Sequence, residues 1–410
     1  SMQTGTNGTS YYFSVASGDI TNFFNEVDLN TPWDYHYENL DSRTILDRLA
    51  AVKYFVVKAG EEEYLPYGYD TLAAEVEKND KLYRAYECKN ALPIGYTYDS
   101  YIPEEKYAKM STVEKQQALL QGVILSNSTV PETTSEFNDR EVPYKLVTGC
   151  REKDGKLIVT KENAQAKLVF DGLDECETYL ITEGVDYEAL SPRELISDKK
   201  WSKMTLYEQK KIQYENSTWR YWKESQKAYI DVTGQFLDKT ISIFTDKYNA
   251  YSGRSDFLCN TGYSVKGKKS ITLTFENTGV YSYKNMKVVC QPIENIESQT
   301  TKLGAESLEN VEIKNHELTG NISVSKDKVL VISLPYSKGF QAYVDGQKTE
   351  LKQANTMYMA LELKKGAHEI RLTYCTPYLK AGLILTCAGV LCYICVVLAY
   401  KKKRGKKKHG

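Results

Sequence analysis

Apolar and polar residues follow different patterns in three parts of the chain, and the C-terminal pattern is the clearest. Residues 381–400 form an uncharged run, followed at once by seven Lys and Arg residues within positions 401–408. A helix rises about 1.5 Å per residue, so about twenty residues cross a hydrocarbon core about 30 Å thick. Basic residues that flank one end of such a helix indicate that this end faces the cytoplasm. The pattern predicts a transmembrane helix at 379–400, a cytoplasmic tail at 401–410 and an extracytoplasmic location for the bulk of the chain.

This assignment raises two questions: whether the apolar run is a membrane span, and how the preceding residues reach the extracytoplasmic side. A buried core helix would have a polar stripe and would not end in a lysine-rich tail, so a membrane span is favoured. The first residues have neither the basic region nor the apolar stretch of a signal peptide. Either a signal peptide has been removed, or the chain is the C-terminal piece of a larger membrane protein.

The pattern over residues 10–142 predicts a mixed α/β domain. Helical spacing at 44–50 runs into an apolar, β-branched and aromatic stretch at 52–57, which is typical of a buried strand. A second strand is expected at 81–88. A helix is expected at 103–125, with a capping sequence from Ser111 to Glu114 inside it. The polar stretch at 127–138 is typical of a linker and marks the end of this domain.

Residues 143–376 show short alternating runs separated by turns. Eleven such runs lie between residues 156 and 374, and Asp345-Gly346 between two of them is typical of a type I′ hairpin turn. Many short strands at this spacing predict a jelly-roll-like β-sandwich. A polar helical pattern at 191–222 interrupts it, and a short helix is expected at 295–308. The predicted fold class is therefore α+β, with one C-terminal transmembrane helix.

The charge of the chain limits the kinds of partner it can bind, and its cysteine content bears on zinc sites and disulfides. Without the seven cations of the tail, 46 Lys and Arg residues stand against 54 Asp and Glu, which gives a net charge of −8. This charge argues against nucleic acid or anionic lipid as a partner of the part before the apolar run. Three of the nine cysteines lie in the apolar run and six are scattered singly. Their spacing does not resemble a zinc site, and disulfides are compatible with the pattern but not required by it.

The sequence shows no recognisable catalytic motif. Only four histidines occur, none with a partner at metal-ligand spacing, and nucleophile-elbow, P-loop and dinucleotide-binding signatures are missing. Acidic pairs such as Asp345 with Glu350 arise freely in a chain with 54 carboxylates and do not identify a glycosidase. We therefore expect neither catalytic residues nor a metal site nor a bound cofactor in this segment.

Aromatic clusters are better candidates for ligand contacts. Their rings can stack on sugars while neighbouring polar groups fix the orientation of the ligand. The alternative is that the same rings pack between the sandwich and its helical insertion. The candidate binding residues are Trp33, Tyr96, Tyr98, Tyr101, Trp219 and Trp222.

A longer pattern precedes the apolar run. Residues 335–348 fit PYxxGφxAxVDGxK, where φ is an apolar residue, and residues 366–374 fit GxHxIxLxY. This pattern resembles the YfhO family of bacterial membrane proteins, and residues 12–14, 46–57, 92–98 and 114–125 also resemble it. The motif itself is typical of β-hairpins and is interpreted as structural. Its residues are Pro335, Tyr336, Gly339, Phe340, Asp345, Gly346, Gly366 and His368.

The resemblance implies a function for a larger protein. Members of the family look like multi-pass glycosyltransferases of the GT-C type, which use a polyprenyl-phosphate sugar donor outside the cytoplasm. The resemblance also implies a role in glycosylating teichoic acids of the Gram-positive cell envelope. The essential acidic residue of such enzymes lies in an early loop, which has no counterpart here. The implied partners are the lipid bilayer, a cell-envelope glycan and the multi-pass region. The resemblance also allows for a divalent metal in that multi-pass region.

This segment would then bind the acceptor or act as a scaffold. The alternative is a non-catalytic, single-pass surface protein, either a carbohydrate-binding module or an adhesin. A sortase signal is not supported, because the residues before the apolar run contain no LPxTG-like motif. A self-contained extracellular hydrolase lacks a recognisable site.

Overall fold

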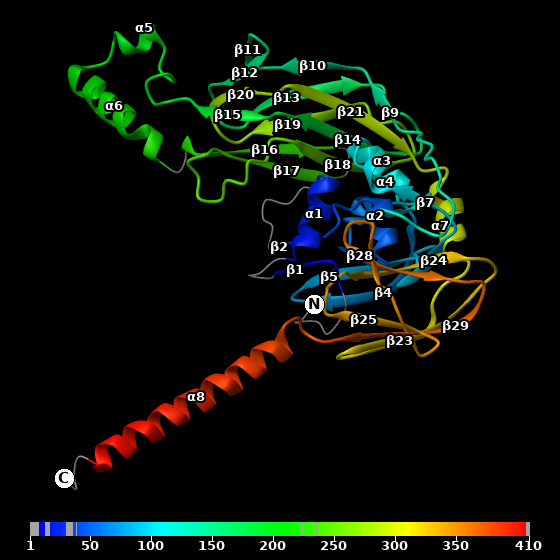
Figure 1. The fold of residues 1–410 in the computed structure, drawn as a ribbon. Coiled ribbons are helices and arrows are strands. Elements are labelled where there is room, and N and C mark those ends of the chain that lie inside the picture. Colours follow the sequence, from blue (N-terminus) through cyan, green and yellow to red (C-terminus); the bar gives the residue numbers. More distant parts are fainter. Residues whose placement is uncertain are drawn as a thin grey trace.

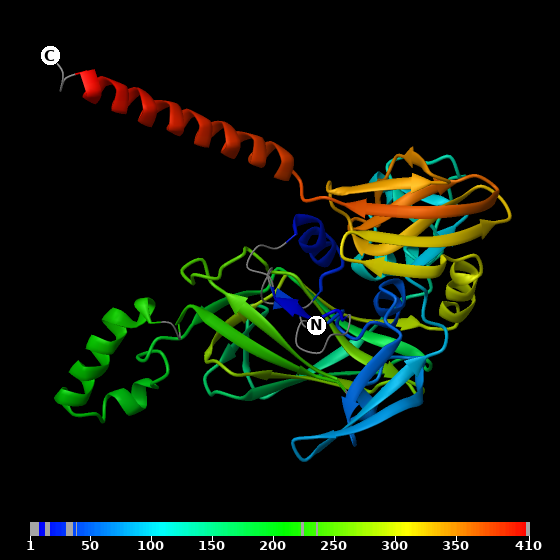
Figure 2. The same cartoon turned by 90° about the horizontal axis from the view of Figure 1, so that it is seen from below.

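The computed structural model describes residues 8–12, 17–29, 36–37, 39–222, 225–234 and 237–406. It confirms an α+β fold with one apolar helix at the C-terminus. Two β-sandwiches lie at opposite ends of the body and N-terminal helices lie between them (Figure 1). The C-terminal helix projects away from the body, which is also clear from below (Figure 2).

Short helices and small sheets form the N-terminal unit. An antiparallel sheet has the order β3-β5-β4, β7 pairs with β8 in parallel, and β1 pairs with β2. The helices are α1 (Gly18–Glu26), α2 (Thr44–Leu49), η1 (Glu62–Tyr64), α3 (Glu104–Tyr107) and α4 (Thr112–Ala118). The strands are β1 (Tyr11–Tyr12), β2 (His36–Tyr37), β3 (Tyr54–Lys58), β4 (Tyr69–Lys78), β5 (Lys81–Cys88), β7 (Tyr101–Pro103) and β8 (Val123–Leu125).

The first sandwich spans residues 140–292. A sheet of order β10-β13-β19-β16-β17 packs against sheets of order β18-β14-β21-β9 and β11-β12-β20-β15. Burial alternates along β13, β16 and β19, as expected for strands with one face in the core. The strands are β9 (Arg140–Val142), β10 (Tyr144–Thr148), β11 (Arg151–Lys153), β12 (Lys156–Val159), β13 (Ala164–Phe170), β14 (Cys176–Glu183), β15 (Asp186–Ala189), β16 (Lys227–Thr233), β17 (Asp238–Phe244), β18 (Phe257–Ser264), β19 (Ser270–Phe275), β20 (Gly279–Ser282) and β21 (Asn285–Pro292).

Helices interrupt and follow the first sandwich at the places that the sequence predicts. Residues 191–222, here called the arm, contain α5 (Asp198–Trp201), α6 (Leu206–Thr218) and η2 (Trp219–Tyr221). The arm extends away from the sandwich (Figure 1). The short helix predicted at 295–308 is α7 (Ile296–Gly304), which packs on the N-terminal unit.

The second sandwich combines residues 309–374 with one N-terminal strand. A sheet of order β22-β23-β29-β25-β26 faces a sheet of order β27-β28-β24-β6, with a separate apolar core between them. Asp345 and Gly346 form the turn between β25 and β26 with φ angles of 54° and 77°, as the predicted type I′ turn requires. The strands are β6 (Gly95–Tyr98), β22 (Glu309–Lys314), β23 (Glu317–Val324), β24 (Lys328–Pro335), β25 (Phe340–Val344), β26 (Gln347–Thr349), β27 (Lys352–Ala354), β28 (Tyr358–Leu363) and β29 (Gly366–Tyr374).

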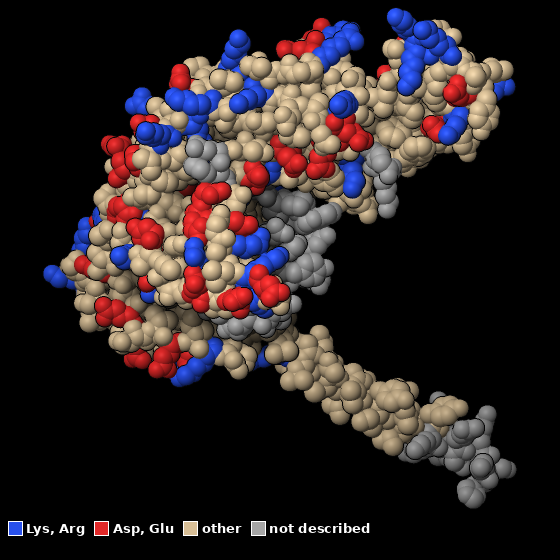
Figure 3. Space-filling model, turned by 180° about the vertical axis from the view of Figure 1, so that it is seen from behind, with Lys and Arg blue, Asp and Glu red and all other residues tan. Residues whose placement is uncertain are grey.

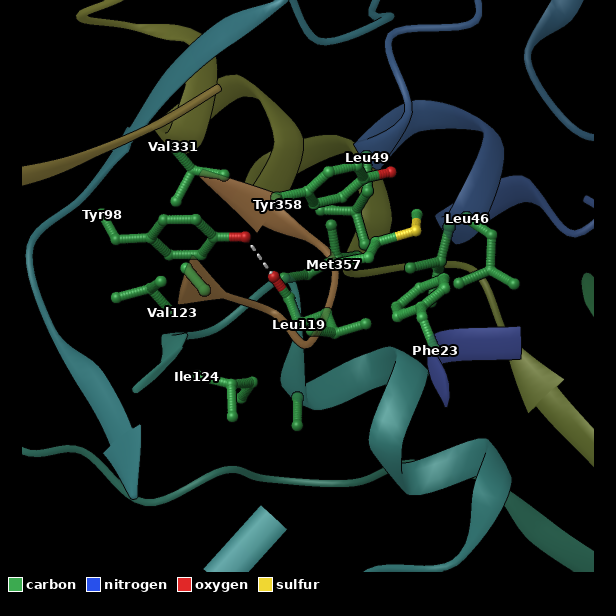
Figure 4. Packing of buried hydrophobic residues seen from close by; sticks show 14 of the residues in the cluster. Phe23, Leu46, Leu49, Tyr98, Leu119, Val123, Ile124, Val331, Met357 and Tyr358 are labelled. Atoms are coloured by element: carbon green, nitrogen blue, oxygen red, sulfur yellow. Dashed lines mark hydrogen bonds between the residues drawn. The ribbon is translucent and has the colours of Figure 1, made fainter. Parts of the chain in front are cut away.

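The sheet that contains β6 and β24 is buried on both faces. Leu330 and Ile332 of β24 point into the second sandwich, whereas Val329 and Val331 point into the core of the N-terminal unit. This explains why β24 is a continuous apolar run instead of an alternating one. The core of the N-terminal unit thus includes residues of this sheet, and we call it the shared core. Figure 4 shows Val331 beside Tyr98 in the shared core, where the Tyr98 hydroxyl donates a hydrogen bond of 2.5 Å to the carbonyl of Leu119.

The structure differs from the predicted division into domains 10–142 and 143–376. Residues 143–376 contain two apolar cores instead of one, and β6 from the N-terminal part completes the second sandwich. The helix predicted at 103–125 also differs. A capping box at Ser111 and Glu114 starts α4 as a new helix, and the apolar β8 then leaves the helical path to pair with β7.

The C-terminal helix α8 (Leu379–Lys406) confirms the predicted apolar helix. Its segment Leu379–Tyr400 is long and apolar enough to cross a membrane, with a mean hydropathy of 2.5, and no part of that segment is buried in the body. A helix of this length would not leave its apolar side chains in water, so its position fits insertion in a bilayer.

Substitutions at Tyr98 test how much the shared core contributes to the stability of the chain. We expect Tyr98→Phe to destabilise the chain by about 1–3 kcal/mol, because the carbonyl of Leu119 loses its buried donor. Tyr98→Ala should cost about 3–5 kcal/mol, because it adds a cavity. Urea denaturation of the detergent-solubilised chain measures both changes. Tyr251→Phe is the matched control, since Tyr251 is 51% exposed, and an equal loss in that variant would contradict the assignment.

Candidate functional site

The strongest candidate site is a cleft where the N-terminal unit meets the first sandwich and α7. Its volume is about 1060 Å³, at the upper end of the range for small-molecule sites. We call it the junction cleft. Its lining residues include Arg48, Tyr67, Gly68, Asp70, Asn90, Tyr263, Glu297 and Lys302.

Arg48 is the charged group at the base of the junction cleft. It lies on α2, and its side chain is fully buried. Its guanidinium donates to Glu297 Oε1 at 2.5 Å and to Thr300 Oγ1 at 3.1 Å, both on α7. Arg48 Nε has no hydrogen-bond partner among the described residues. A buried donor without a partner destabilises the fold, so this arrangement has a cost in stability.

Two tyrosines form an aromatic wall above Arg48. The rings of Tyr67 and Tyr263 have centroids 5.1 Å apart, and the Arg48 guanidinium carbon lies 5.6 Å from the centroid of Tyr67. The Tyr263 hydroxyl donates to Glu175, which fixes that ring. Burial raises the pKa of Tyr67, and the charge of Glu297 acts in the same direction. The Tyr67 hydroxyl therefore stays protonated at neutral pH and can donate a hydrogen bond, whereas the proton of the Tyr263 hydroxyl is already bonded to Glu175.

Gly68 permits the close approach of this wall to Arg48. Its φ angle is +87°, and a Cβ atom at this position would lie 2.5 Å from Arg48 Nη2. Any other residue would therefore strain the backbone and displace the guanidinium. On the other side, Asn90 donates to the second carboxylate oxygen of Glu297, so both oxygens of Glu297 are bonded.

A network of buried polar groups holds α2 in place. Glu177 of β14 accepts hydrogen bonds from the Thr44 amide at 3.0 Å and the Thr44 hydroxyl at 2.5 Å, so a carboxylate of the first sandwich caps α2. Arg43 donates to the carbonyl of Val27 at 2.6 Å, and Lys239 pairs with Asp41 at 2.7 Å. These contacts fix α2, and with it Arg48, against the first sandwich.

The predicted aromatic candidates do not lie together. Tyr96 and Tyr98 are 0% and 1% exposed in the shared core, so neither ring can stack on a sugar. Both pack in this core, not between the sandwich and its helical insertion. Tyr101 is half-buried against the same core. In sequence, a tyrosine on a buried strand and a tyrosine in a binding site can both have small polar neighbours. The sequence pattern therefore does not distinguish the two.

The remaining aromatic candidates lie elsewhere. Trp219 and Trp222 meet edge to face in the arm, with centroids 5.2 Å apart, and Trp222 is 38% exposed. Their role in binding stays a prediction. Trp33 lies outside the described residues.

The residues of the YfhO-like motif make local contacts within the second sandwich. Asp345 accepts hydrogen bonds from the Glu369 amide at 2.9 Å and pairs with His368 Nδ1 at 2.8 Å, and this pair lowers the pKa of Asp345. His368 Nε2 lies 2.7 Å from the carbonyl of Lys364. Asp345 thus joins two hairpins.

The other motif residues also have structural roles, in hydrogen bonding, packing or turns. The Tyr336 amide bonds to the carbonyl of Met357 at 2.7 Å, and Phe340 packs against Tyr374. A Cβ atom at Gly339 would lie 2.6 Å from the Cys375 carbonyl. Pro335 ends β24, Gly346 completes the hairpin turn, and Gly366 has a φ angle of 145°.

Sequence reasoning missed the residues of the junction cleft. Except for Arg48 and Tyr67, these residues are far apart in the chain: Arg48, Tyr67, Tyr263 and Glu297. The one available signal was a pair of charged residues, Asp47-Arg48, inside an otherwise apolar helix. Among the described residues, no group of three or more His, Cys, Asp or Glu side chains is placed to hold a metal ion.

The fold and the apolar helix define a membrane-anchored protein with a large, strand-rich body. The family model described as "Bacterial membrane protein YfhO" matches residues 1–386, so the chain belongs to the YfhO family. It is 22% identical over 417 residues to the "Uncharacterized protein YfhO" of Bacillus subtilis (strain 168). That match covers 98% of this chain and 42% of the relative, so the chain spans about two fifths of the relative's length.

A solved structure was also similar over a limited region. The mycobacterial arabinofuranosyltransferase AftD matches 36% of this chain and 12% of its own, with 13% identity and a TM-score of 0.15. A similarity at this level carries no argument about fold or function.

Asp47 provides a pH test of the polar network beside the cleft. Burial raises the pKa of Asp47 well above its usual range, and the nearby charge of Glu177 adds to the effect. A carboxyl with a higher pKa in the folded chain stabilises the fold at low pH, and this stabilisation is lost as pH rises through the folded pKa. We therefore expect the unfolding free energy of the wild type, relative to Asp47→Asn, to fall between pH 4 and the raised pKa.

Urea denaturation of both proteins across pH 4–8 measures this difference. Asp171→Asn is the matched control, because the Asp171 side chain is 93% exposed. Parallel pH profiles for the wild type and Asp47→Asn would contradict the assignment.

Proposed function

We propose that this chain is the extracytoplasmic part of a membrane glycosyltransferase of the YfhO family. In this proposal the longer protein transfers a sugar from a polyprenyl-phosphate donor to a cell-envelope polymer such as teichoic acid. Bond making belongs to the multi-pass region beyond this chain, and the chain itself binds the acceptor. Membership in a membrane-protein family and the apolar helix α8 support the membrane setting.

The junction cleft is the observation that carries acceptor binding. Aromatic faces such as those of Tyr67 and Tyr263 stack on the apolar faces of sugar rings. The carboxamide of Asn90 supplies a donor, and Asp70 supplies an acceptor, for the hydroxyls around the ring. Lys302, at the exposed rim, adds a positive charge that it shares with Asp99 at 3.2 Å.

The geometry also favours binding over catalysis in this segment. Both carboxylate oxygens of Glu297 are already bonded, to Arg48 and Asn90, so this group is not free to act as a base. The cleft can therefore hold and orient a saccharide, while the transfer step needs groups from elsewhere in the longer protein.

Variants of the aromatic wall test this proposal. We expect Tyr67→Ala and Tyr263→Ala each to weaken binding of teichoic-acid fragments about five- to thirtyfold, because each removes a stacking surface worth about 1–2 kcal/mol. Isothermal titration of the detergent-solubilised chain measures the affinity. Tyr251→Ala is the matched control, because Tyr251 is exposed outside the cleft and should bind as the wild type does.

Two further results separate the parts of the proposal. In the full-length protein, cleft variants should raise KM for the acceptor and leave KM for the lipid-linked donor unchanged. Fragment binding without any sugar transfer by the full-length protein would contradict the enzyme and favour a surface carbohydrate-binding protein. Unchanged affinity in both tyrosine variants would exclude the junction cleft as the acceptor site.

The same proposal places the body outside the cytoplasm and the basic tail inside it. The seven cations after residue 400 support this orientation. An epitope added at the C-terminus should resist protease in intact cells and become sensitive after lysis, while the body is cleaved in both. An epitope digested in intact cells would reverse the assignment.

A further inference from the structure

The arm at residues 191–222 carries the most exposed apolar side chains of the described body. Of the described residues before Tyr378, the four highest exposures of large apolar side chains are those of Leu206, Tyr207, Tyr214 and Tyr221, at 69–79%. All four lie in the arm. Large apolar side chains exposed in one segment mark a surface that contacts something else.

Helix geometry places two of these side chains, those of Tyr207 and Tyr214, on one side of α6. Tyr207 and Tyr214 are seven residues apart, so two turns bring them to the same face. Lys210 and Lys211 lie between them on that face, at the third and fourth positions after Tyr207. The face that carries Tyr207 and Tyr214 therefore also carries lysines. Glu208 and Glu215 lie at its edge, as neighbours of Lys211 at the i−3 and i+4 positions.

The described residues of α5 and α6 include no buried side chain. Local polar contacts hold the arm together. Thr205 and Glu208 form a capping box, Arg193 lies 4.4 Å from the ring centroid of Trp201, and Gln209 donates to the Trp201 carbonyl at 2.9 Å. A helix of about thirteen residues is marginal in water without a packed face. A surface that covered the tyrosine face would stabilise it.

The charge of the arm is opposite to that of the rest of the body. Residues 191–222 contain seven Lys and Arg against four Asp and Glu, whereas residues 1–400 as a whole carry a net charge of −8. Lys and Arg side chains gather at the end of the arm (Figure 3). A local excess of positive charge on an acidic protein favours an anionic partner.

The arm and the membrane helix leave the body toward the same side. Both views show α6 and α8 projecting from the same side of the body, with the two sandwiches behind them (Figures 1 and 2). The membrane that receives α8 therefore faces the side from which the arm extends.

We propose that the arm is a peripheral membrane anchor that binds the anionic lipid surface around α8. The rings of Tyr207 and Tyr214 enter the interface between headgroups and acyl chains, where tyrosine is favoured. Lys210 and Lys211 bind lipid phosphates, with further attraction from Lys199 and Lys200. This inference concerns a surface distinct from the junction cleft and does not depend on the proposed enzyme.

A second attachment to the membrane fixes the orientation of the body. A single helix allows the body to rotate about the helix axis and to tilt. With the arm bound as well, both motions are restricted, and the junction cleft keeps one orientation relative to the bilayer.

Hydrogen–deuterium exchange of the full chain in lipid nanodiscs tests the anchor. One set of discs contains phosphatidylcholine alone, and the other also contains phosphatidylglycerol. We expect the amides of α6 to exchange more slowly in the anionic discs, by about fivefold for each lysine that contacts the surface. Lys210→Glu/Lys211→Glu should abolish this difference between the two lipids.

Matched variants complete the test. Lys145→Glu/Lys167→Glu makes the same charge change at exposed positions of the first sandwich and should retain the protection. Lys210→Gln/Lys211→Gln removes the charges with little change in helix propensity and should lose it, which excludes a mere loss of the helix. Equal exchange in both lipids, or protection that charge reversal leaves intact, would overturn the proposal.

Discussion

The burial of charged side chains on one short helix is the constraint on which the arrangement of the body depends. Arg48 is fully buried, and a charge removed from water must be paired and hydrogen-bonded, which here requires Glu297 and Thr300 of α7. At the other end of the helix, Thr44 requires the carboxylate of Glu177 in the first sandwich. Hydrogen bonds are directional, so α2 fixes the relative positions of α7 and the first sandwich more strictly than apolar packing would.

The junction cleft follows from this arrangement. Its walls come from the loop before β4, from the end of β18 and from α7, and none of these segments forms a concave surface alone. The site exists only while α2 holds the units together. This explains why a glycine is needed at position 68, where the loop passes directly over the guanidinium, and why the arginine serves both the architecture and the site. Removing its charge would alter both.

Local patterns predicted the elements better than their assembly. The apolar run at the C-terminus, the Asp345-Gly346 turn and all eleven predicted strands correspond to observed elements, because each depends on periodicity or turn chemistry within a few residues. The two cores could not be predicted, because β6 crosses to the second sandwich through pairing with β24, which no local signal encodes. Likewise, an aromatic cluster in sequence does not reveal which face is buried. The residues of the junction cleft meet only through tertiary contacts.

The pairing of β6 with β24 sets an order on the synthesis of the protein. The Ser333 amide and the Ile94 carbonyl, which are bonded at 2.8 Å, lie 239 residues apart in the chain. A chain that emerges from its N-terminus presents β6 long before its partner exists. Pairing over such a separation is slow. The first sandwich, which lies entirely within the intervening segment, can fold as a closed unit in that interval, and the second sandwich closes only when the residues just before the membrane helix arrive. The body is thus completed at the membrane, as its anchor is made.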